Sequence, residues 1–158
     1  MPRLRAILTP DEHLQVFVLE SLFPPPHAFV LNNALHTLLH LSMQPGTPHP
    51  VLLSEQQFTE QELNLVLPLL TNYPEYAPME ELYASYCYGF DGLSEQRIDQ
   101  ARDHLHEALE EGVWDQELRA LRNVLSRARF KLRHLGLDAV SLLETGYLLI
   151  GNTRRRAS

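Results

Sequence analysis

The sequence holds one cysteine, Cys87, which excludes an internal disulfide framework and any structural zinc site built from two or more thiolates. No apolar run approaches the roughly 18–20 residues of a membrane span, and the N-terminus lacks the apolar core of a signal peptide. A glycine loop that cradles phosphate and a GxSxG nucleophile elbow are also missing. We therefore expect a soluble, cytoplasmic protein that is not an enzyme and has no cofactor or metal.

Basic residues are scarce in the first two thirds of the chain, with no Lys or Arg between Ala6 and Gln96. Residues 1–96 carry two arginines against eleven acidic residues, whereas residues 119–158 carry nine basic residues against two acidic ones. This asymmetry suggests an anionic partner for the C-terminal part alone. An ordinary solvated helix face followed by a frayed arginine tail is the alternative explanation.

The 158 residues, 44% of them hydrophobic, suit one globular domain with an appendage. Thr9, Pro10 and Glu12 form a helix start, and the apolar stripe behind them predicts a short helix over residues 10–22. Residues 1–27 are therefore expected to be an N-terminal helical appendage.

Extended runs follow this appendage. Residues 28–31 and 34–41 predict two strands around a tight turn, although a helix over residues 33–42 also fits the leucine spacing. Residues 51–53 predict a third, short strand.

Helical signals dominate the remainder of the chain. A capping box at Thr59 starts the first helix, which Pro68 should kink or shorten. Three further helices are expected to begin at Pro78, Ser94 and Asp115, and the last of them runs to about Leu135. Two short strands then form a hairpin, at residues 140–143 and 147–150.

The helix expected over residues 115–135 has two different faces. Apolar residues at spacings of three and four form a core-facing stripe: Leu118, Leu121, Leu125, Ala128, Leu132 and Leu135. The opposite face suits the DNA major groove, where Arg reads guanine, Asn reads adenine and apolar groups touch thymine methyls. The residues predicted to face bases are Arg119, Asn123, Ser126, Arg127 and Phe130. The cations predicted to contact phosphates are Arg122, Arg129, Lys131, Arg133, Arg154, Arg155 and Arg156.

Four segments resemble, in order and register, the OmpR-type output domain of bacterial response regulators. FTEQELNLVLPLL resembles its "LTxxEfxLLxxLL" opening, MEELYASY its second helix, RALRNVLSRARFKL its recognition helix, and LLETGYLL its wing. The resemblance implies an α+β fold: a winged helix-turn-helix with a small N-terminal antiparallel sheet, an inserted helix before the recognition helix, and a C-terminal β-hairpin wing. The implied winged-helix domain spans residues 28–151, with an insertion at 90–114 and a basic tail at 152–158.

The chain departs from that family in three ways. The family joins its second and third helices by a short loop, whereas residues 90–114 add a helix here. Leu148 and Leu149 stand where the wing usually has a basic residue. Residues 1–12 look like the start of a receiver domain, but its remainder and phosphoacceptor are absent, so phosphorylation control is not predicted.

These observations predict a sequence-specific DNA-binding transcriptional regulator that inserts a basic recognition helix into the major groove of double-stranded DNA. A homodimer is compatible with this function, with the helix at 10–22 as the candidate contact or as a cover for the chain's own sheet. The rival interpretation is an acidic protein-interaction module. Residues 1–118 have a net charge of −14, and this surface with the inserted helix would dock on RNA polymerase or another regulator.

The histidines and the cysteine predict no chemistry. His36 and His40 have the spacing of a metal pair but lack an acidic or thiol partner nearby. His104 and His106 are expected to lie on different helix faces in solvent. Cys87 is expected to be a small buried residue.

Overall fold

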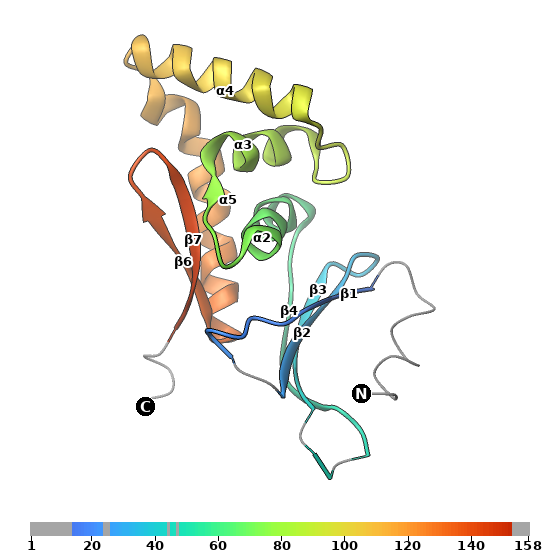
Figure 1. Cartoon of the computed structure of the whole chain (residues 1–158). Coiled ribbons are helices and arrows are strands. Elements are labelled where there is room, and N and C mark those ends of the chain that lie inside the picture. Colours follow the sequence, from blue (N-terminus) through green and yellow to red (C-terminus); the bar gives the residue numbers. More distant parts are fainter. Residues whose placement is uncertain (1–13, 24–25, 44, 47, 153–158) are drawn as a thin grey trace. The chain divides into compact units, whose positions relative to one another are not determined.

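Figure 1 shows the computed structural model, which describes residues 14–23, 26–43, 45–46 and 48–152. Within these residues the fold is α+β, with four helices and two antiparallel sheets. The chain divides into two compact units. Unit 1 holds the described residues up to Thr59 together with residues 131–138 and 150–152. Unit 2 holds residues 60–130 and 139–149.

The sheet of unit 1 is a four-stranded antiparallel meander in the order β1-β2-β3-β4. Its strands are β1 (Leu14–Phe17), β2 (His27–Asn32), β3 (Thr37–Ser42) and β4 (Val51–Gln57). β2 lies inside the sheet, and its run Ala28–Leu31 is buried on both faces. A continuous apolar run, rather than an alternating one, is what such a strand requires.

A tight turn joins β2 to β3. The side chain of Asn32 accepts hydrogen bonds from the amides of Ala34 and Leu35, at 3.0 and 3.1 Å. His36 closes the turn with a φ of 57°. An Asn side chain that mimics a backbone turn explains why the chain reverses here. The strand alternative is confirmed from residue 37 onward, while residues 34–36 belong to the turn, and the helix alternative over residues 33–42 is wrong.

The expected helix over residues 10–22 is also wrong where the structure describes it. Residues 14–17 form β1, which pairs with β2 along its whole length. Phe17 and the β-branched Val16 favour a strand, and the ladder with β2 outweighs the helical spacing of the apolar residues. Leu19 then accepts the amides of Leu22 and Phe23 in a turn. Residues 10–13 lie outside the described residues.

Four helices are described: α2 (Glu60–Asn72), α3 (Met79–Tyr88), α4 (Glu95–Glu110) and α5 (Trp114–His134). The side chain of Ser94 caps α4 by accepting the amide of Arg97 at 3.2 Å, as predicted. α3 packs against both α2 and α4. The predicted order of helices, including the additional α4 before α5, is confirmed.

Pro68 lies inside α2 without ending it. A proline has no amide hydrogen for the carbonyl four residues earlier, which here belongs to Asn64. The buried hydroxyl of Ser85, on α3, donates a hydrogen bond to that carbonyl. α3 thus supplies the donor that the proline lacks, and α2 continues to Asn72.

The second sheet has the order β5-β7-β6, with β5 (Ala77–Pro78), β6 (Leu137–Leu142) and β7 (Gly146–Gly151). β6 and β7 are the predicted hairpin, longer than expected at the N-terminal end of β6. Gly146 faces Pro78 across the β5–β7 pair. A Cβ at Gly146 would lie 2.1 Å from the carbonyl oxygen of Ala77, so the pairing requires glycine.

Candidate nucleic-acid interface

The outer face of α5 is exposed as the sequence predicts. Every residue predicted to face bases is exposed: Arg119, Asn123, Ser126, Arg127 and Phe130. The six residues of the apolar stripe, and Val124 beside them, are buried. The two faces of the helix are therefore confirmed, while contact of the outer face with bases stays a prediction.

After Glu117 the charge on this helix is of one sign. From Leu118 to Leu137 the sequence has six Lys and Arg residues and no Asp or Glu. The side chain of Arg127 is 61% exposed, and so is the apolar Phe130. Arg119 is exposed and has no ion pair within the described part of the chain. A duplex would meet cationic, amide and apolar groups on one face.

Within the described residues, Arg122, Arg127 and Arg133 contact carboxylates of their own chain. Arg122 Nη1 lies 2.9 Å from Asp115, and Arg133 Nε lies 3.0 Å from Asp138. Asp115 is 85% exposed, so this pair is well hydrated and a phosphate can compete for the guanidinium. Asp138 is only 16% exposed, so its contact holds the Arg133 guanidinium more firmly against β6.

The third contact joins Arg127 to Glu62, whose carboxylate is 2% exposed. Arg127 Nε and Glu62 Oε2 are 3.7 Å apart. The sequence predicts Glu62 only as part of a capping box. No pattern near Glu62 in the sequence predicts that it is buried beneath an arginine of another helix, since the two residues are far apart in the chain.

The remaining predicted phosphate contacts are less exposed or lie outside the described residues. Arg129 is half-buried, and Lys131 places its ammonium 5.6 Å from the centre of the buried Phe58 ring. At this distance a lysine gains from the negative face of the ring. Arg154, Arg155 and Arg156 lie outside the described residues.

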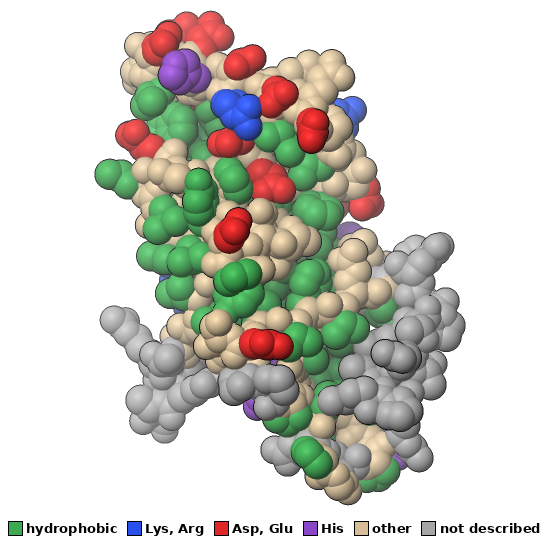
Figure 2. Space-filling view, in the orientation of Figure 1, with side chains coloured by type: hydrophobic (Ala, Val, Ile, Leu, Met, Phe, Trp, Pro, Cys, Tyr) green, Lys and Arg blue, Asp and Glu red, His purple; other side chains and the backbone are tan. Residues whose placement is uncertain are grey.

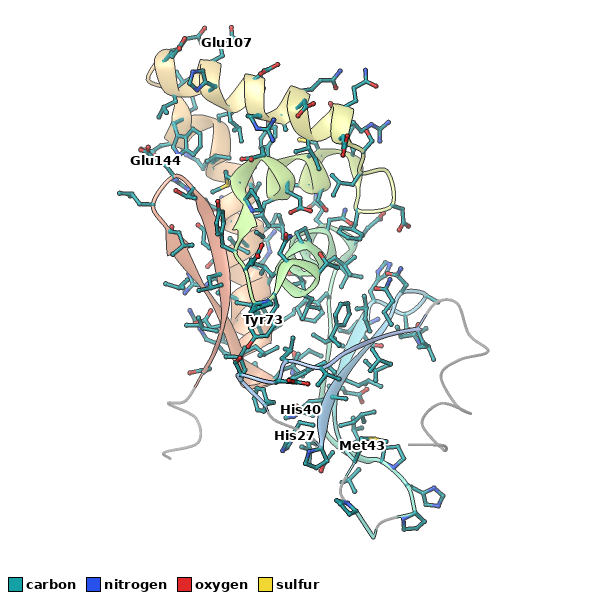
Figure 3. The ribbon with its side chains drawn as sticks, in the orientation of Figure 1. His27, His40, Met43, Tyr73, Glu107 and Glu144 are labelled. Carbon is teal, nitrogen blue, oxygen red and sulfur yellow. The ribbon has the colours of Figure 1, made fainter. Side chains whose placement is uncertain are left out.

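The hairpin of β6 and β7 presents apolar rather than basic residues. Leu143 at its tip is 85% exposed, and Val140 and Leu142 are partly exposed. Figure 2 shows hydrophobic side chains gathered over this hairpin. Glu144, beside Leu143, occupies the turn with a φ of 61° (Figure 3).

The outer face of α4 is acidic. Six carboxylates on or beside it are exposed: Glu95, Asp99, Asp103, Glu107, Glu110 and Glu111. Figure 2 shows acidic side chains gathered along this helix. Arg102 partly compensates them, since it pairs with Asp99 at 2.7 Å and with Glu80 at 3.6 Å. Such an acidic surface repels a polyanion and attracts a positively charged partner.

A polar cluster joins α3, α4 and α5. Tyr83 donates a hydrogen bond of 2.9 Å to Glu117, and Nε2 of His104 bonds the same carboxylate oxygen. The rings of Tyr83 and His104 stack with centroids 5.6 Å apart. His104 and His106 are exposed, as the sequence predicts, but the contact of His104 with Glu117 was not predicted, because it joins two different helices.

These contacts shift two pKa values. Hydrogen bonds from His104 and Tyr83 lower the pKa of Glu117. Desolvation and the bond to Glu117 raise the pKa of Tyr83 far above its usual value.

Cys87, one turn from Tyr83, is exposed, which corrects the prediction of a buried residue. Desolvation of its thiol still raises its pKa, so the thiolate is disfavoured.

The histidine pair suggested by the sequence does not form. His36 lies in the β2–β3 turn, and His40 instead bonds His27, with 3.0 Å between Nε2 of His40 and Nδ1 of His27 (Figure 3). His40 also stacks on Phe29, with ring centroids 4.5 Å apart. In the part of the chain that the structure describes, no three His, Cys, Asp or Glu side chains converge on a metal position.

No protein-family model, curated protein or solved structure matches the chain. None of the helices in the described ranges is both long and apolar enough to cross a membrane.

Proposed function

We propose that this chain is a winged-helix transcriptional regulator that binds double-stranded DNA sequence-specifically, with α5 as the recognition helix in the major groove. The observation that carries the proposal is the outer face of α5 from Arg119 to His134, which is largely exposed, basic and without carboxylates, and which carries residue types suited to reading base edges. The order of α2, α3 and α5, followed by the β6–β7 hairpin, supports this fold.

In this proposal the residues divide into two roles. Arg119, Asn123, Ser126, Arg127 and Phe130 face base edges. The cations beside them position the helix on phosphates: Arg122, Arg129, Lys131 and Arg133, with the tail arginines Arg154, Arg155 and Arg156. Arg122 exchanges its hydrated pair with Asp115 for a phosphate when the duplex binds.

Selection from a duplex library with a randomised centre tests the proposal. The wild-type chain should enrich a defined sequence. Arg119→Ala should relax the preference at one or two base pairs, whereas Lys131→Ala should weaken all sequences alike.

Arg102→Ala is the matched control, because it removes the same charge from an exposed position on α4. Its selected sequence should equal that of the wild type. A wild-type chain that enriches nothing would contradict the proposal, as would an unchanged preference in Arg119→Ala.

The second candidate is a protein-interaction module that docks on RNA polymerase or another regulator. The apolar hairpin tip favours it, because Leu143 is exposed where a DNA-binding wing would gain from a cation. The acidic face of α4 adds a surface for a basic partner. Retention of purified RNA polymerase by the wild type, its loss in Leu143→Ser, and failure to bind any duplex would together favour this candidate over the first.

A further inference from the structure

The ion pair between Glu62 and Arg127 combines a buried carboxylate with an exposed guanidinium. Glu62 belongs to the first turn of α2 and is 2% exposed, whereas the Arg127 side chain on α5 is 61% exposed. Both residues belong to unit 2. The carboxylate is therefore held in place by its surroundings, and the arginine can adjust its position above it.

The geometry of the pair leaves the two terminal guanidinium nitrogens of Arg127 available to bind a ligand. The contact is made by Nε, the guanidinium nitrogen closest to the main chain, at 3.7 Å from the carboxylate. The two terminal nitrogens lie further out along the side chain. These nitrogens form the fork that a guanine accepts at O6 and N7.

Without a restraint, an exposed arginine samples many rotamers, and binding must pay the entropy of fixing one of them. A fixed negative charge beside Nε reduces the number of rotamers that the Arg127 side chain occupies before DNA binds. The same attraction acts on Arg127 whether or not DNA is present, so the effect is preorganisation and not a new contact with DNA.

We propose that Glu62 is a positioning residue that holds Arg127 ready to read a guanine, an inference that rests on the proposed DNA-binding function. Glu62 itself does not touch the duplex. A purely structural role, in which Arg127 only neutralises the buried carboxylate, predicts a change in stability without any change in base preference.

Glu62→Gln tests the proposal, because it keeps the side-chain shape and removes the charge. On the duplex selected by the wild type, we expect Arg127→Ala to reduce discrimination of one G·C pair by about fivefold or more. Glu62→Gln should reduce discrimination at the same base pair and change affinity for unrelated duplexes no more than Glu60→Gln does. In the double variant Glu62→Gln with Arg127→Ala, discrimination should fall no further than in Arg127→Ala alone.

Glu60→Gln is the matched control. It removes the same net charge from the same turn of α2, at an exposed position, and it should leave base discrimination unchanged. Thermal unfolding of each variant separates loss of fold from loss of specificity. If Glu62→Gln does not fold, Glu62→Asp withdraws the carboxylate by one methylene and should reduce the same discrimination partially.

The outcomes separate the two proposals. A wild-type chain without sequence preference overturns the DNA-binding function and this inference with it. A wild-type preference that Arg127→Ala weakens, while Glu62→Gln or Glu62→Asp behaves as Glu60→Gln does, overturns only the role of Glu62.

Discussion

The hydroxyl of Ser85 is expected to be a main reason why α2 tolerates a proline. Ser85 is completely buried and donates to the carbonyl of Asn64, the acceptor that the missing amide of Pro68 leaves without its usual partner. Ser85→Ala removes this donor from a completely buried position and leaves the carbonyl of the half-buried Asn64 without it. The change removes one oxygen and creates almost no cavity, so the lost hydrogen bond dominates the result.

Loss of one partner of a hydrogen bond in the protein interior costs about 1–3 kcal/mol. Chemical denaturation should therefore show a loss of unfolding free energy of that size for Ser85→Ala. The thermal midpoint should fall by roughly 2–4 °C for each kcal/mol lost in a chain of this length. Thr71→Ala is the control, because its hydroxyl also donates to a carbonyl of α2, at 3.0 Å, but at an exposed residue where water replaces it.

A double-mutant cycle isolates the cause. Pro68→Ala restores an amide for the carbonyl of Asn64, so it should recover more stability in the Ser85→Ala background than in the wild type. Equal effects of Pro68→Ala in both backgrounds would refute the reasoning. So would a Ser85→Ala variant as stable as Thr71→Ala.

Two other predictions concern unit 2. The lowered pKa of Glu117 means that its contacts with His104 and Tyr83 stabilise the fold above the usual carboxyl pKa of 4.5. This stabilisation is lost as the pH falls through the lower pKa of the folded state, so Glu117→Gln should flatten the acid end of a stability–pH curve measured by denaturant unfolding. Gly146→Ala should destabilise by about 1–3 kcal/mol, because the new Cβ would meet the carbonyl of Ala77; an unchanged thermal midpoint would contradict this.

The sequence predicted best what depends on local spacing. The buried stripe and exposed face of α5 follow from helical periodicity alone, and the cap of α4 follows from Ser94 and its neighbours. The α+β class and the order of the helices follow from the same signals. These features need no information about residues distant in the chain.

Long-range contacts account for the errors. Residues 14–17 carry apolar spacing that fits a helix, but pairing with β2 makes them a strand. Pro68 breaks an isolated helix, and only the distant Ser85 explains why α2 continues. The burial of Glu62 under Arg127 and the contact of His104 with Glu117 likewise join separate helices.

The salt dependence of duplex binding tests the central proposal, that the outer face of α5 binds DNA, most directly. Fluorescence anisotropy with a labelled duplex chosen by selection, repeated from low to physiological salt, gives log K against log salt. If about five phosphates are neutralised, the slope should lie near −4 to −5. A slope near zero, or equal binding by a variant that lacks Arg119, Arg122 and Arg129, would contradict it.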